Sequence, residues 1–243
     1  MNFEKVIKTI SATIAAVVVY IMAAGFYLGT KGFVMGADGV PVLVKQAQAN
    51  IQKINPNIVL PEGHVLGKAN APIAIYEFSS FGCYHCAEFH LKTLPKIKKE
   101  YIDNGIVKLV FVPFPLEAKS MQATMIAECI NNDKYFDFVD LMFKKQREWG
   151  LSRKSENIIL QYAKLSGLSE EKAKICMQNE DMAREIIAQR QMGMDNYKIQ
   201  GTPSFLIAHK NDREIHYGAP SFDDIKQMVE ERIGHKIEKT AKK

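Results

Sequence analysis

Two cysteines separated by two residues, Cys83 and Cys86, lie between an apolar strand-like run, 73–78, and a helix-like run that opens at Ala87. Thiols with this spacing at the start of a helix can close a disulfide across its first turn. The free backbone N–H groups and the dipole of the helix N-terminus favour a thiolate on the first sulfur. The junction therefore predicts a strand that leads directly into a helix and carries a redox-active dithiol.

Other uses of a Cys-x-x-Cys pair fit this sequence less well. A structural zinc site needs four ligands, usually from a second close pair, whereas Cys129 and Cys176 lie far apart on separate helical runs. A c-type haem attachment requires a histidine directly after the second cysteine, and Ala87 occupies that position. A purely structural bridge across two residues is strained and easily reduced, which suits turnover. We therefore expect no metal and no separate cofactor at this site.

The two sulfurs need different environments for turnover. Cys83, nearer to solvent at the helix start, is predicted to be the attacking thiolate, and Cys86, one turn inside, to resolve the mixed disulfide. His85 could direct a hydrogen bond or a positive charge toward the Cys83 sulfur and lower its pKa, at about 1.4 kcal/mol for each unit. A solvent-exposed turn residue is the alternative interpretation of His85.

Glu77 is the candidate proton acceptor. It shares a strand face with Ile73 and Ile75 by the period of two residues, and its strand leads into the dithiol. A partly buried carboxylate with a raised pKa could accept the Cys86 proton as that thiol attacks. The alternative is an edge-strand carboxylate that faces water.

Thr202-Pro203 opens a later strand. Proline cannot donate to a strand ladder, so the bond before it is a candidate for cis geometry. A cis bond would turn the residue 202 backbone outward beside the dithiol, ready to pair with an extended substrate. A trans turn proline is the alternative.

The remaining cysteines, Cys129 and Cys176, each have apolar neighbours. A bridge between them would close a loop of about 48 residues and stabilise the fold by about 4 kcal/mol in the chain-entropy model. Two buried free thiols remain the other possibility.

The N-terminal segment 1–31 has Lys5 and Lys8 followed by an uncharged apolar run from Thr9 to Thr30. Its length favours a membrane-spanning anchor, although a signal peptide cut near the small residues at 23–25 is the alternative. Either interpretation places the rest of the chain outside the cytoplasm, in the periplasm, anchored to the inner membrane or soluble. The net charge of +5 is too diffuse for a nucleic-acid surface.

The rest of the chain predicts an α/β fold. A connecting region, 32–68, carries a short amphipathic helix marked by Val44, Ala47, Ile51 and Ile54, which packs on its own domain or, as the alternative, joins two protomers. A strand–helix–strand unit, 69–116, is completed by a strand hairpin and a last helix, 198–235. Between them lies an all-helical insertion, 117–197, and a basic tail, 236–243, ends the chain.

Together, the segment from Glu77 to Cys86, the helical insertion and Gly201-Thr202-Pro203 resemble the DsbA-like thiol-disulfide oxidoreductases of bacterial envelopes, over roughly residues 65–235. That family is a known example of a lowered cysteine pKa and an oxidising potential, so the resemblance implies both properties here. It also implies a thioredoxin fold interrupted by a helical domain. In the site, it implies that Cys83 is the nucleophile, Cys86 the resolving thiol, His85 the thiolate stabiliser, Glu77 the buried acid and Pro203 the cis-proline.

By this resemblance, the partners would be reduced or unfolded exported proteins and a quinone-linked membrane oxidoreductase that restores the disulfide. Tyr84, Thr202 and Pro203 would contact substrate. Tyr84 replaces the proline, and Thr202 the valine, that are common in the strongest oxidants, and threonine is more usual in related isomerases and reductases. The sequence thus predicts an oxidase, with an isomerase or reductase as the nearest alternative and a non-catalytic peptide-binding or holdase module as an alternative of another class.

Overall fold

The computed structural model of the protein describes residues 33–35, 41–43 and 51–234. It divides the chain into two compact units, 1–51 and 52–243. In the first unit, β1 (Phe33–Met35) and β2 (Pro41–Leu43) pair in antiparallel fashion. The predicted membrane segment and the basic tail lie outside the described residues. Within the described ranges, no helix combines the length and the apolar composition that crossing a bilayer requires.

A six-stranded mixed sheet organises the second unit, with the strand order β3-β8-β7-β5-β6-β4. The strands are β5 (Ile73–Ser79), β6 (Val107–Pro113), β7 (Ser204–His209), β8 (Asp212–Tyr217) and the short β3 (Ile51–Lys53) and β4 (His64–Leu66). β5 runs parallel to β6 and antiparallel to β7. Every residue of β5 is buried because both faces of the sheet are covered, which explains why its sequence is mostly apolar, with Glu77 and Ser79 as buried exceptions.

A helical run follows β5 and comprises α3 (Tyr84–Glu88), η1 (Phe89–Thr93), α4 (Leu94–Ile97) and η2 (Lys98–Ile102). The run starts three residues before the predicted Ala87, because the Cys83 side chain accepts the Cys86 N–H and caps the first turn. The two π-helical segments, η1 and η2, flank the turn that holds Pro95, which has no N–H to donate to the preceding turn. Gly105 then reverses the chain with a φ of 73°.

The two faces of the sheet bury different partners. One face packs against the helical run and against α11 (Phe222–Ile233), which begins with a capping box formed by Ser221 and Asp224. The other face packs against Tyr197, Ile199 and partly buried residues of the segment that precedes β4.

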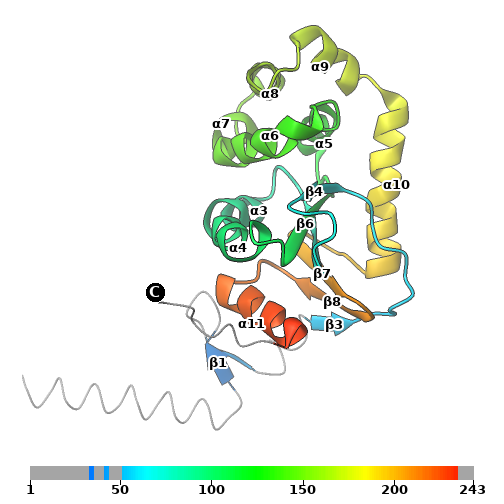
Figure 1. Cartoon of the computed structure of the whole chain (residues 1–243). Coiled ribbons are helices and arrows are strands. Elements are labelled where there is room, and N and C mark those ends of the chain that lie inside the picture. The colour runs from blue at the N-terminus through cyan, green and yellow to red at the C-terminus, as the bar shows by residue number, and fades with distance from the viewer. Residues whose placement is uncertain (1–32, 36–40, 44–50, 235–243) are drawn as a thin grey trace, which may run out of the picture. The chain divides into compact units, whose positions relative to one another are not determined.

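The predicted helical insertion contains α5 (Ala118–Ala127), α6 (Asn132–Lys144), α7 (Gln146–Gly150), α8 (Ser155–Leu165), α9 (Glu170–Met177) and α10 (Glu180–Tyr197). Figure 1 shows α10 extending from this helical block along the sheet. The core of the block includes Phe81, Cys86 and Phe111 from the sheet unit, so the two parts share one apolar interior at the dithiol.

The region 32–68 differs from its prediction. Residues 44–50 of the expected amphipathic helix lie outside the described residues, but Ile51 belongs to β3 and Ile54 follows that strand, so the expected helix is wrong at this end. The Ile54 N–H donates to the Arg213 carbonyl at 3.1 Å, because β8 has backbone groups on its outer side that a helix at this position would leave unpaired.

The end of β6 is occupied by a proline, Pro113. Pro113 is the last residue of the strand and lies opposite Ser79. At the end of a strand, the missing proline N–H removes little from the ladder.

Candidate functional site

The dithiol lies where the central strand β5 passes through a short loop into α3. Cys83 is the N-cap of that helix and is half-buried, and Cys86 lies inside the first turn with 0% exposure. Both thiols are free, and the Cys83 sulfur accepts the Cys86 backbone N–H at 3.3 Å. The structure therefore holds the pair in its reduced form, with one sulfur open to solvent and the other enclosed.

The Cys83 thiol is acidic: its pKa is lowered from 9.0 to about 6. A hydrogen bond from the Cys86 thiol is the main cause. Partial burial opposes it, while the Thr202 side chain and the backbone N–H groups of Cys86 and His85 lower the pKa further. These donors favour the thiolate because they stabilise the charged form more than the neutral one.

Burial raises the pKa of Cys86 well above its usual value. The hydrogen bond to Cys83 and the negative charge of Glu77 raise it further, and a hydrogen bond with Ser79 opposes them. At neutral pH the negative charge therefore resides on Cys83, while Cys86 keeps its proton.

His85 does not occupy the position that the sequence suggested. Its side chain is 69% exposed, and Nδ1 lies 3.5 Å from a carboxylate oxygen of Glu88, one turn along α3. Its contribution to the acidity of Cys83 comes from the backbone N–H. The imidazole lies toward Glu88, whereas the backbone N–H groups of the first turn point at the N-cap residue. Tyr84 beside it is also exposed.

Glu77 is fully buried on β5, which lies in the middle of the sheet and not at an edge. Its Oε2 lies 2.8 Å from Nε2 of His90, which is fully buried on the helical run. Sequence reasoning missed His90. The sequence signal that could have identified His90 is its spacing. His90 follows Cys86 by four residues and therefore shares the buried face of that helix.

The Thr202–Pro203 peptide bond is cis. The Thr202 carbonyl accepts a hydrogen bond from the Cys83 thiol at 3.3 Å, across 119 positions of sequence. This carbonyl and the partly exposed Cys83 sulfur thus form one small polar surface at which an extended chain could be held.

The helical block holds the loop before the dithiol by hydrogen bonds that the sequence did not indicate. Nε2 of Gln146 on α7 donates to the Phe81 carbonyl at 2.7 Å and to the Cys83 carbonyl at 2.8 Å. The Gly82 N–H donates to Ser120 Oγ at 2.7 Å. A Cβ at Gly82 would clash with a carboxylate oxygen of Glu117, so a larger residue fits here only if that side chain shifts.

Cys129 and Cys176 form a disulfide that joins the turn after α5 to α9. Cys129 lies just beyond the end of α5 and not on the helix itself. This bridge leaves Cys83 and Cys86 as the free pair. Among the described residues, no group of three or more His, Cys, Asp or Glu side chains is placed to hold a metal ion.

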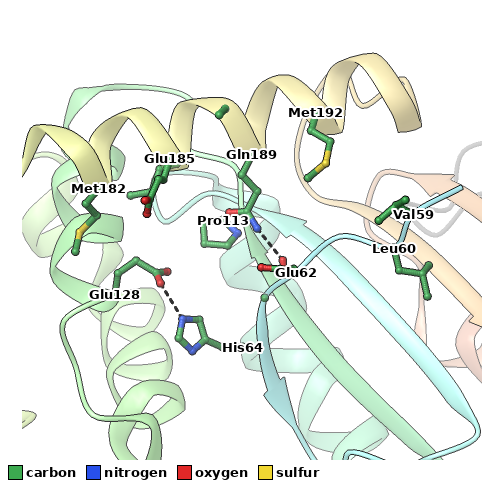
Figure 2. A pocket seen from close by; sticks show the side chains of 13 residues that line it. Val59, Leu60, Glu62, His64, Pro113, Glu128, Met182, Glu185, Gln189 and Met192 are labelled. Carbon is green, nitrogen blue, oxygen red and sulfur yellow. Dashed lines mark hydrogen bonds and ion pairs between the residues drawn. The ribbon is translucent and has the colours of Figure 1, made fainter.

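A groove of about 840 Å³ lies between α10, the segment before β4 and the end of α5. Figure 2 shows His64 paired with Glu128, and Gln189 of α10 bonded to the backbone of Glu62, inside this groove. The dithiol and the Thr202–Pro203 pair are not among the residues that line it. The groove is therefore separate from the redox site.

The fold and the site together define a thioredoxin-fold protein with a reactive dithiol and a cis-proline beside it. A family model described as Thioredoxin matches residues 60–231, and the chain belongs to that family. The predicted fold, a thioredoxin fold with a helical insertion as in DsbA-like proteins, is confirmed by this match and by the solved structures it resembles.

Several known proteins are similar to this chain. A Rickettsia felis protein, provisionally named a protein-disulfide oxidoreductase, is 26% identical over 176 residues, which are 72% of this chain and 62% of that protein. Disulfide bond formation protein D of Bacillus subtilis is 29% identical over 174 residues, 70% of this chain and 76% of that protein. The crystal structure of alpha-DsbA1 from Wolbachia pipientis has a TM-score of 0.66 and 27% identity, and covers 73% of this chain and 94% of its own.

The alignments do not cover the full length of these relatives. The chain spans 62% and 56% of the length of the Rickettsia felis and Rickettsia bellii proteins, which is less than two thirds. The residues that the family model matches, 60–231, include the dithiol.

Proposed function

We propose that the protein is an extracytoplasmic thiol-disulfide oxidoreductase that donates the Cys83–Cys86 disulfide to newly exported polypeptides. The observation that carries the proposal is the contrast between the two thiols, with the pKa of Cys83 at about 6 and that of Cys86 raised well above 9.0. A stable Cys83 thiolate favours the reduced form, and a disulfide whose reduced form is stabilised is a good oxidant.

The reaction proceeds by two exchanges. A substrate thiolate attacks Cys83 Sγ, the Cys83–Cys86 bond breaks, and Cys86 leaves as a thiolate that takes up a proton. A second substrate thiolate then attacks the substrate sulfur of the mixed disulfide, and Cys83 leaves as a thiolate. The substrate loses two electrons and gains a disulfide, and the protein becomes the dithiol. The low pKa of Cys83 makes it the better leaving group in the second exchange.

Substrate contact is proposed at Tyr84, Thr202 and Pro203. Tyr84 is 60% exposed beside Cys83, and the Thr202 carbonyl lies at the Cys83 sulfur. An extended substrate strand can pair with backbone groups at this position while its cysteine reaches Cys83.

Recharging needs an external oxidant, for which we propose a quinone-linked membrane oxidoreductase. We also propose that the segment 1–31 exports the chain and anchors it to the inner membrane, or is removed so that the protein is soluble in the periplasm. No metal, cofactor or nucleic acid has a role in this scheme.

The test uses the oxidised protein and a reduced peptide that contains two cysteines. We expect the protein to oxidise the peptide and to become reduced in equal amount, and we expect Cys83→Ala to abolish the transfer. A C129A/C176A variant is the matched control, which should retain it. Transfer by Cys83→Ala would overturn the mechanism.

An isomerase or reductase is the second candidate, favoured by Tyr84 and by Thr202 before the cis-proline. The equilibrium of the dithiol against glutathione separates the two functions. A strongly oxidising value supports the oxidase, and a value near that of reducing thioredoxins supports the alternative. A peptide-binding module without catalysis would show no exchange at all.

A further inference from the structure

His90 is an ionisable side chain in the interior that the proposed exchange chemistry does not yet use. It follows Cys86 by one helical turn and has no exposed side-chain surface. Its Nε2 lies 2.8 Å from Oε2 of Glu77, whose side chain is equally buried. The centre of the imidazole ring lies 4.4 Å from that of the Phe143 ring and 5.8 Å from that of the Phe111 ring, so apolar groups hold it in place.

The other side of the ring faces the helical block. Nδ1 of His90 lies 3.9 Å from Oδ1 of Asp140 on α6, and the Asp140 side chain is 68% exposed. The ionisable groups that act on His90 are therefore Glu77 from β5 and Asp140 from α6. Glu77 in turn acts on Cys86 and on the buried Tyr135. His90 thus connects the acid beside the dithiol to the surface of the insertion.

A buried carboxylate without a partner takes up a proton, because desolvation disfavours its charged form. An imidazolium at hydrogen-bond distance opposes this, because it stabilises the carboxylate. Burial by itself would lower the pKa of His90, but the Glu77 charge and the contacts with Asp140 outweigh it and raise the pKa to about 9. At neutral pH the geometry therefore favours an ion pair of protonated His90 and ionised Glu77.

We propose that His90 is a positioning residue that keeps Glu77 ionised and oriented, so that Glu77 can take the Cys86 proton when Cys86 attacks a mixed disulfide on Cys83. This inference rests on the proposed function. Oε1 of Glu77 is buried and has no hydrogen-bond partner among the described residues, so it has a free acceptor site.

The proposed step balances as follows. The proton of the Cys86 thiol moves to Glu77, and the Cys86 thiolate attacks Cys83 Sγ. The Cys83–Cys86 bond forms, the bond from Cys83 to the partner sulfur breaks, and the partner leaves as a thiolate. Glu77 later returns the proton to water.

The test mixes the reduced full-length protein with an aromatic disulfide whose thiolate is coloured, and follows colour by stopped flow. The first release reports the attack by Cys83, and the second reports the attack by Cys86. We expect His90→Gln to leave the first phase unchanged and to slow the second by about tenfold or more near pH 7. The deficit should shrink as pH rises, because the Cys86 thiol then loses its proton to solvent without the help of Glu77 and His90.

Two comparisons separate this role from a purely structural one. Adding H90Q to Glu77→Gln should slow the second phase no further, since His90 acts through Glu77. Asp140→Asn should slow the second phase more than Asp137→Asn, a matched control on the same helix whose carboxylate is paired with Lys134.

An unchanged second phase in H90Q, or an equal loss when H90Q is added to E77Q, would overturn the inference. If H90Q does not fold, the E77Q/H90Q double variant replaces it, because it leaves neither buried charge unpaired. A second phase as fast as that of E77Q then supports the proposal, and a slower one overturns it. Absence of the first phase in the unaltered protein would instead count against the proposed function.

Discussion

Cys83 and Cys86 differ in acidity although only two residues separate them. In the reduced protein we expect the thiolate absorbance to rise in two separate steps, the first with a pKa of about 6 for Cys83. Cys83 is a neutral thiol below this pH and a thiolate above it. The rate of alkylation at Cys83 should follow the same curve, and a single step near the ordinary thiol pKa would contradict the assignment.

Substitutions can distinguish the contributions of Cys86 and His85 to the low pKa of Cys83. The main cause is the hydrogen bond from Cys86, so Cys86→Ala should raise the pKa of Cys83, while Cys86→Ser, which keeps a donor, should raise it less. His85→Ala should leave the pKa nearly unchanged because the exposed imidazole lies toward Glu88. Titration of the three variants checks this, and a larger rise in H85A than in C86A would restore the role first given to the His85 ring.

At the scale of elements, the disulfide Cys129–Cys176 joins α9 to the end of α5 across a separation of 47 residues. A C129A/C176A variant should lose about 4 kcal/mol of unfolding free energy, because its unfolded chain regains the freedom that the bridge removes. Urea unfolding at equilibrium measures this. C83A/C86A is the control, because the Cys83–Cys86 disulfide that it removes from the oxidised protein closes only a very short loop. Equal losses of unfolding free energy in the two variants would be inconsistent with the loop-length argument.

The short helix α7 stabilises the redox loop through one side chain. Gln146→Glu keeps the shape of the residue but removes the amide N–H groups that bond to the Phe81 and Cys83 carbonyls, and should cost about 1–3 kcal/mol. Gln191→Ala is the control, because its amide bonds only to the exposed Asp195 within α10 and its loss should stay within about 0.5 kcal/mol. Thermal unfolding compares them, and similar losses would argue against a special role of Gln146.

The longer elements were accessible from sequence because their patterns are local. The mostly apolar run of β5, the helical stripes of the insertion and the Ser221 cap can each be recognised within a few residues. The edge strands β3 and β4 have only three residues each and form because neighbouring strands offer backbone partners, which no local pattern records.

The same distinction applies to the site. The spacing of Cys83 and Cys86 and the proline at 203 could be recognised in the chain itself. The partnership of Glu77 with His90 could not, since it depends on how the helix lies across the sheet. The reach of Gln146 to the redox loop depends equally on the packing of the insertion.

On the scale of the whole molecule, the reduced and oxidised forms should respond differently to pH. The folded pKa of Cys83 is depressed from 9.0 to about 6, so its thiolate stabilises the reduced fold fully above pH 9 and loses this effect as pH falls through 6. The oxidised form has no such group. The unfolding temperature of the reduced form, relative to that of the oxidised form, should therefore rise from pH 6 to pH 9.

Comparing the unfolding temperatures of the reduced and oxidised forms also controls for the titration of other groups. His90, with a pKa raised to about 9, stabilises the fold below pH 6.5 and loses that effect as pH rises through 9. It is present in both forms and so cancels to first order when they are compared. If the difference in unfolding temperature between the reduced and oxidised forms does not change from pH 6 to pH 9, the assigned acidity of Cys83 is contradicted.

The central sheet has a short strand at each border, β3 beside β8 and β4 beside β6, both from the stretch that precedes the first long strand. Unpaired strand borders recruit other chains and seed aggregation. The substrates that we propose, unfolded polypeptides, are such chains, and these two short strands shield the longer ones from them. Removing that stretch should therefore leave the redox chemistry intact at first and yet make the protein aggregate with unfolded polypeptides.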